Sequence, residues 1–235
     1  MSFYYDYDNI RKEFDTINEF LKDANNKCIN FIFNKQIKEL KNQLAEISNP
    51  NRMYERMGVD ILLIAVSQNL LPVADVLCRE LCVLRYSLVD EYGYIIPNVK
   101  VVDYNKIPSN NYEIYVRGKK VFVSELSSDD IKNLNSQPII DSLKNVCFEY
   151  VHKVMSKTDA LKLIELVKQQ HSSLATDTFP NYLTPIDLKN ILANLIKDKI
   201  SIKDIVLIFE ILNDIARYTQ NIDELTEKLK KELVF

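Results

Sequence analysis

The hydrophobic period of the sequence changes at Gly93, and this change constrains the fold more than any other feature. Before it, Leu77, Leu81, Leu84 and Leu88 recur at spacings of four, three and four, which places them on one stripe of a helix. After it, the letters YIIPNVKVVDY alternate with the period of two that a strand shows. We therefore predict a helix that ends at a left-handed glycine, followed directly by a strand.

Two further strands are predicted after this one. Residues 107–111, Ile-Pro-Ser-Asn-Asn, have turn composition, because proline presets φ and asparagine accepts the left-handed region. Residues 112–117 alternate apolar and polar side chains, which indicates a half-buried strand. Gly118-Lys119 then predicts a two-residue hairpin loop into a last strand at 120–124.

An apolar run, VDILLIAV at 59–66, has the length and composition of a strand that is covered on both faces. A helix beginning near Pro72 links this run to the strand at 98–103, and such an order predicts a β-α-β unit with parallel strands. The predicted fold class is therefore α+β. It has a small mixed β-sheet with a β-α-β-β core, packed beside an all-helical subdomain, plus an N-terminal helical extension.

The last third of the chain is predicted to be helical. Thr184 and Asp187 stand three residues apart, as the two partners of a helix N-cap do. Ser201 is predicted to cap the next helix, which is apolar nearly all round and hence central, and Asn221 or Asp223 opens the last one. The predicted domains are the extension at 1–50, the α/β subdomain at 51–137 and the all-helical subdomain at 138–235.

Composition excludes several classes of function. Thirty basic and 33 acidic residues give a net charge of −3, so nothing electrostatic favours nucleic acid. The longest apolar run, ILLIAV, is far shorter than the roughly 20 residues that span a bilayer, so no direct membrane insertion is expected. Four cysteines in 235 residues do not form a disulfide scaffold, which favours the reducing cytoplasm.

The residues with catalytic or metal-binding chemistry form no recognisable motif. Cys78 and Cys82 are four residues apart on one predicted helix, and His152 and Cys147 could complete a metal site. We expect the two helical cysteines to be small buried residues instead, since free cysteine is among the most buried residue types. No phosphate-binding loop, dinucleotide fingerprint or HExxH motif occurs. We therefore predict no cofactor, no metal and no enzymatic activity.

Residues 84–118, LRYSLVDEYGYIIPNVKVVDYNKIPSNNYEIYVRG, resemble the cytoplasmic domain of the large export-gate protein of bacterial type III secretion systems and of its flagellar counterpart. In that family a helix ends at glycine, a proline follows at the strand start, and an aspartate precedes a proline turn and a second strand. The matching positions are Leu88, Glu91, Gly93, Ile96, Pro97, Val99, Asp103, Pro108, Asn110, Tyr112, Ile114 and Gly118.

A second stretch, LKNILANLIKDKISIKDIVLIFEILNDIA at 188–216, is similar to the helical subdomain of the same family. Here Lys203 stands where the family usually has arginine, and Phe209 stands where it has leucine. The family's membrane domain, its inserted subdomain and its C-terminal subdomain have no counterpart in the chain. We expect either an excised fragment or a naturally reduced relative.

The resemblance implies a cytoplasmic, non-enzymatic module of a type III secretion or flagellar export apparatus. Its implied partners are export substrates, chaperones, other apparatus subunits and further copies of itself in a homo-oligomeric ring. One alternative is a soluble scaffold or regulatory protein that keeps the fold but binds a different partner through its N-terminal helices. A third, unrelated alternative is a small metal or thiol enzyme that uses Cys78 and Cys82.

Polar and aromatic side chains without a predicted role in the core are the candidate binding residues. They are Asp103, Tyr104, Asn110, Tyr115 and Lys203. The chain has 13 tyrosines, a residue type enriched at interfaces. Asp103 and Asn110 are equally suited to bonding turn N–H groups. Lys203 is expected to be exposed beside the predicted cap and to contribute little to stability.

Overall fold

The structure is a computed structural model of the chain. It describes residues 11–13, 15–16, 19, 37–42, 58–179 and 181–233. The chain forms two compact units, Met1–Val59 and Asp60–Phe235, and each is described by itself. In the first unit the described residues up to position 42 are helical. Most of the predicted extension over 1–50 lies outside the described residues, and the predicted domain boundaries stay predictions.

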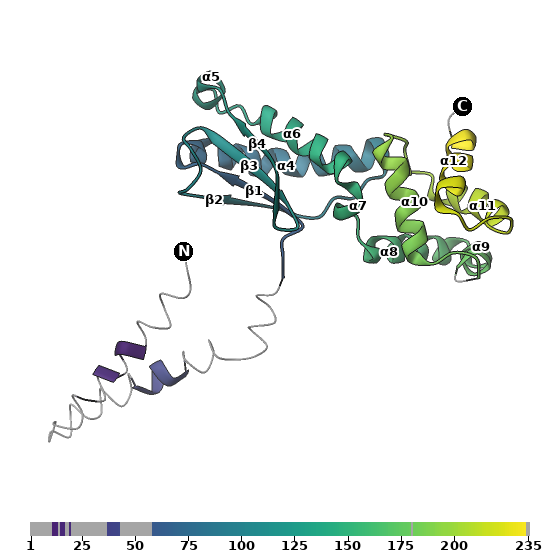
Figure 1. The fold of residues 1–235 in the computed structure, drawn as a ribbon, viewed down its shortest axis with the longest axis horizontal. Coiled ribbons are helices and arrows are strands. Elements are labelled where there is room, and N and C mark those ends of the chain that lie inside the picture. Colours follow the sequence, from purple (N-terminus) through teal and green to yellow (C-terminus); the bar gives the residue numbers. More distant parts are fainter. Residues whose placement is uncertain are drawn as a thin grey trace. The chain divides into compact units, whose positions relative to one another are not determined.

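The second unit contains a four-stranded mixed sheet with the strand order β2-β1-β3-β4 (Figure 1). The strands are β1 (Leu62–Val66), β2 (Val99–Asp103), β3 (Asn111–Val116) and β4 (Lys119–Glu125). Strand β1 pairs in parallel with β2 and antiparallel with β3, which pairs antiparallel with β4. This confirms the predicted mixed sheet and its β-α-β-β core.

A 22-residue helix, α4 (Leu71–Tyr92), connects the two parallel strands after a short 3-10 turn, η1 (Gln68–Leu70). The leucines of the predicted stripe are buried, at most 5% exposed. The helix ends at Gly93, whose φ is 70° and whose N–H donates to the carbonyls of Leu88 and Val89. The left-handed glycine predicted from the change of period is therefore confirmed.

The hairpin loop between β3 and β4 differs from the prediction by one residue. It consists of Arg117 and Gly118, with φ of 49° and 75°, whereas Lys119 already pairs with Val116. A two-residue loop of this kind needs positive φ at both central positions, a conformation that glycine favours but arginine rarely adopts. The prediction therefore placed the loop at Gly118-Lys119 instead of Arg117-Gly118.

Helices make up the rest of the described chain, and β4 is followed by no strand within it (Figure 1). They are α5 (Ser128–Lys132), α6 (Gln137–Glu149), α7 (Val151–Val154), α8 (Lys157–Gln170), α9 (Ser172–Thr178), α10 (Pro185–Lys197), α11 (Ile205–Ile215) and α12 (Ile222–Leu233). Helices α4 and α6 contact each other, and they pack on β2 and β4 respectively. None of the described helices is both long and apolar enough to cross a bilayer.

Two of the three predicted helix starts are confirmed. Thr184 and Asp187 form a capping box at α10, and Asn221 accepts hydrogen bonds from the first N–H groups of α12. Ser201 is not the cap of α11, because this helix begins only at Ile205 and Asp204 caps it by accepting from the N–H of Leu207. The residues between Ser201 and Asp204 instead lie against the end of α4.

This junction joins the end of α4 to the segment before α11 through backbone contacts. The Ile202 N–H donates to the Tyr92 carbonyl at 2.8 Å. A Cβ atom at Gly93 would lie 2.9 Å from the Lys203 nitrogen and 3.1 Å from the Ile202 carbonyl carbon. Glycine is therefore needed at position 93 for two reasons, its positive φ and the close approach of a second backbone.

We predict that Gly93→Ala destabilises the protein more than Gly118→Ala. Both substitutions put a side chain on a left-handed residue, at a cost of about 1–2 kcal/mol. The variant at 93 also forces a Cβ against the backbone of Ile202 and Lys203, which adds about 1–3 kcal/mol, whereas Gly118 lies in an exposed turn. Urea unfolding measures the loss of stability in both variants. Equal losses would contradict an energetic role for the contact at position 93.

Candidate protein-binding surfaces

Three of the five predicted site residues lie together where the parallel strands β1 and β2 end. Asp103 is the last residue of β2 and is exposed, and Tyr104 directly after it has 52% of its surface exposed. Asn110 closes the turn before β3 with a φ of 66°. Ligands of open α/β sheets commonly bind outside the carboxyl ends of parallel strands, so this position suits a binding surface.

Side chains from the turn after β1 hold this group in place. Gln68 donates from Nε2 to Oδ1 of Asn105 at 3.0 Å, and Asn69 donates from Nδ2 to Oδ1 of Asn110 at 3.4 Å. Together with Asp103 and Tyr104 these residues form what we call the strand-end rim. The sequence prediction did not include Gln68 and Asn69, because they are separated from their partners by about 40 positions.

Tyr115 lies on the sheet face opposite the helices, and its hydroxyl already has a partner. It donates to the carboxylate of Glu113, which also accepts from Lys120 Nζ at 2.9 Å. The hydrogen bond to Glu113, followed by burial, raises the pKa of Tyr115 to about 12. Burial opposes ionisation of Glu113, yet its two donors outweigh burial and lower its pKa. Tyr115 is therefore half-buried, and its hydroxyl is bonded within the sheet.

Lys203 lies apart from the strand-end rim, at the far end of α4. Its Nζ donates to the Asp90 carbonyl at 2.7 Å, one of the last carbonyls of that helix. Asp90 is about 30 Å along the helix from its first residue. A lysine that bonds the carbonyls of a helix C-terminus stabilises that helix, so this contact gives Lys203 a structural role that the sequence did not suggest.

We predict that Lys203→Ala lowers the free energy of unfolding by about 1 kcal/mol, the usual net value of one hydrogen bond. Lys228→Ala on α12 is the matched control, because Lys228 is also exposed. Lys228→Ala should change the free energy of unfolding by no more than about 0.5 kcal/mol, as most surface substitutions do. Chemical denaturation of both variants measures this difference. If Lys203→Ala left the free energy of unfolding unchanged, the structural role of Lys203 would be contradicted.

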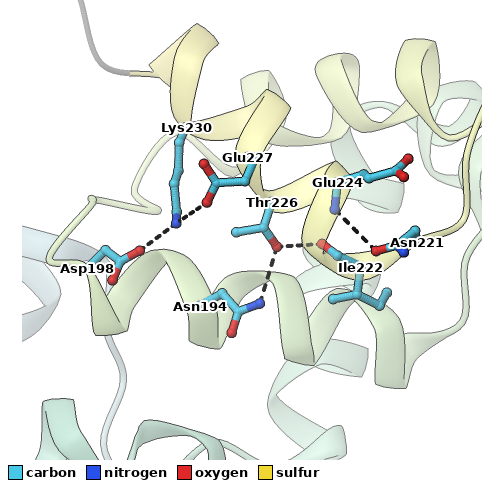
Figure 2. Close-up of polar contacts among 8 residues, drawn as sticks. All are labelled: Asn194, Asp198, Asn221, Ile222, Glu224, Thr226, Glu227 and Lys230. Atoms are coloured by element: carbon cyan, nitrogen blue, oxygen red, sulfur yellow. Dashed lines mark hydrogen bonds and ion pairs between the residues drawn. The ribbon is translucent and has the colours of Figure 1, made fainter.

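A polar cleft of about 290 Å³ lies between α10 and α12 (Figure 2). Figure 2 shows Lys230 reaching between the carboxylates of Asp198 and Glu227, each 2.6 Å from its Nζ. These hydrogen bonds, with Asp198 the stronger influence, raise the pKa of Lys230. Deeper in the cleft Asn194 donates to Thr226 at 3.3 Å. These side chains bond one another across the cleft and so link α10 to α12.

A cluster of basic residues surrounds the short helix α7. Lys189 Nζ donates to the His152 carbonyl and Arg117 Nε donates to the Lys153 carbonyl, both at 2.7 Å. Burial and the positive charges of Lys189, Lys197 and Lys153 lower the pKa of His152. The two bonds join the β3–β4 hairpin and α10 to one end of α7.

We predict that the protein loses stability as the pH falls below about 6.5, the ordinary pKa of histidine. The pKa of His152 is lower in the folded chain than in the unfolded one, so the unfolded state takes up a proton first. Thermal unfolding between about pH 7.5 and pH 5.5 measures this loss. In His152→Asn the slope should be smaller, and an unchanged slope would count against this origin.

The two cysteines of α4 are exposed, so the expectation that they are buried is wrong. Cys82 Sγ points back to the Cys78 carbonyl at 3.8 Å. Cys147 in α6 is buried, and burial raises the pKa of its thiol to about 12. Within the described residues, no three histidine, cysteine or acidic side chains come together as metal ligands would.

Comparison with known proteins agrees with the resemblance predicted from the sequence. The model of the FHIPEP family matches residues 133–235. The flagellar biosynthesis protein FlhA of Bacillus subtilis is 23% identical over 246 residues, covering 84% of this chain and 36% of the relative. FlhA of Borreliella burgdorferi is 18% identical over 83% of this chain and 35% of the relative. The chain thus spans about a third of the length of these relatives.

Solved structures share the fold at low sequence identity. The Shigella flexneri MxiA protein superposes with a TM-score of 0.64 at 14% identity, over 74% of this chain and 63% of that one. CdsV in the Chlamydia pneumoniae complex of CdsV and CdsO reaches 0.61 at 15% identity, over 75% and 65%. Nonameric SctV-C of enteropathogenic Escherichia coli (EPEC) reaches 0.60 at 14% identity, over 74% and 65%. The predicted resemblance to the export-gate cytoplasmic domain is confirmed.

Proposed function

We propose that this relative of the flagellar and type III export-gate proteins is a non-enzymatic, cytoplasmic component of a protein-export apparatus. The match of residues 133–235 to the FHIPEP family, combined with the α+β fold shared with export-gate cytoplasmic domains, is the observation that carries the proposal. No cofactor enters this role. The chain's own contribution is a rigid surface that other proteins bind.

The strand-end rim is the surface we assign to export substrates, chaperones or apparatus subunits. Tyr104 offers an exposed ring with a polar tip, and tyrosine is favoured at interfaces for that reason. Asp103 offers an exposed carboxylate directly beside it. The hydrogen bonds of Gln68 and Asn69 fix the loops beneath, so a partner meets a preformed surface and little ordering entropy is lost.

Self-association into a ring is the second part of the proposal. One structural relative is described as a nonamer, and another as a complex of CdsV with CdsO. These descriptions support copies of this chain and a further apparatus subunit as partners. The alternative of a scaffold that binds through the N-terminal helices relies on residues 1–50, most of which lie outside the described residues. The experiment below separates the two.

We predict that cells lacking the gene secrete less of the export substrates, and that the full chain restores secretion. A chain with a photo-cross-linking amino acid in place of Tyr104 should capture an export component on irradiation. The same amino acid in place of Tyr218 is the matched control, because that tyrosine is 85% exposed and lies after α11.

Mass spectrometry of the cross-linked bands identifies the partner, and size measurement of the purified chain reports on the ring. Normal secretion without the gene would contradict the export role. Capture of the same partners from both positions would contradict the assignment to the rim. Capture from positions within 1–50 instead would favour the scaffold.

A further inference from the structure

Strand β2 is an edge strand whose outer backbone groups are identified by its hydrogen bonds. The Tyr104 N–H donates to the Val66 carbonyl of β1 at 2.9 Å, and β2 pairs with β1 in parallel, with Val101 opposite Ile64. In a parallel ladder alternate residues of a strand bond the same neighbour. Residues 100, 102 and 104 therefore face β1, and the N–H and C=O groups of Val99, Val101 and Asp103 point away from it.

In the part of the chain that the structure describes, β2 has β1 as its one strand neighbour. The other edge, β4, has features that discourage pairing: it begins with two exposed lysines and its register shifts beside Tyr115. β2 has a single lysine, Lys100, which is paired with Asp60 at 3.1 Å. β2 is thus the less protected of the two edges.

An apolar pocket opens near the start of this edge. It has a volume of about 210 Å³, and its lining residues are Cys82, Arg85, Tyr86, Val89, Ile95 and Ile96. Ile96 precedes Val99 by three residues, so their Cα atoms are at most about 11 Å apart. The pocket is smaller than the ~300–1,000 Å³ of typical small-molecule sites, so its size suits one large apolar side chain.

The side chains of Val99 and Val101 point to the same face of the sheet as the pocket. Val99 and Val101 pair with Leu62 and Ile64, whose buried side chains face the helices. Helix α4, which supplies most of the pocket wall, contacts β2. A strand added beside β2 would lie about 4.8 Å outward and send alternate side chains toward α4.

We propose that the free edge of β2 binds an extended, apolar segment of a partner protein by β-strand addition, with one large apolar side chain in the pocket. The outer N–H and C=O groups bond the backbone of the segment, and the pocket selects its side chain. The repeating donors and acceptors match a polypeptide backbone, which neither nucleic acid nor lipid presents. This surface ends at Asp103, which it shares with the strand-end rim, but it uses the backbone of β2 and the pocket instead of the exposed side chains of the rim. Its test uses purified components alone, so its outcome does not depend on the export experiment.

The test uses the full chain and a fluorescein-labelled peptide in which valine and threonine alternate around one central phenylalanine. Fluorescence anisotropy should show saturable binding. Two further peptides carry N-methyl groups on one or the other set of alternate residues. Only one set of N–H groups faces β2. Methylation of that set should abolish binding, and methylation of the other set should leave binding unchanged.

The matched protein variants are Ile95→Lys, which places a charge at the pocket beside Arg85, and Val83→Lys on α4 outside it. The two side chains are similarly exposed, 55% and 60%, so both variants should fold. Ile95→Lys should weaken peptide binding at least about tenfold and Val83→Lys should not. The proposal is overturned if the peptide does not bind, if both methylation patterns act alike, or if both variants act alike.

Discussion

The contact between the end of α4 and the segment before α11 joins the α/β half of the second unit to its helical half. A helix leaves its last four carbonyls without partners inside the helix, so other groups must bond them. Here Ile202 supplies a backbone N–H to Tyr92, and Lys203 supplies its ammonium group to Asp90. Gly93 allows the two backbones to come this close. One residue without a side chain thus lets the segment before α11 bond the end of α4.

Features encoded within a few residues could be predicted from the sequence. The left-handed glycine after α4 and the capping box of Thr184 and Asp187 are examples, since their partners lie three to five residues away. The start of α11 could not be predicted in this way. Ser201 and Asp204 are both good caps, and the bond from Ile202 to Tyr92 selects between them. A contact across about 110 positions leaves no local signal.

The same distinction applies to the candidate site. Asp103, Tyr104 and Asn110 follow from the strand–turn–strand pattern, and the structure places them at one end of the sheet. Gln68 and Asn69 come from another part of the sequence, and nothing near them marks their partners. The buried stripe of α4 was predicted correctly, whereas the predicted burial of Cys78 and Cys82 was wrong. Cysteine, tyrosine and valine suggest burial, and at Cys82, Tyr86 and Val89 they are exposed.

The exposed flank of α4 and the strand-end rim are connected by β2. The strand starts near the pocket of Ile95 and Ile96 and ends at Asp103, where the rim begins. Five residues of strand span about 17 Å, which an extended segment of similar length would cover. A chain that lay along this edge would therefore reach from the apolar pocket to the exposed Tyr104 and Asp103.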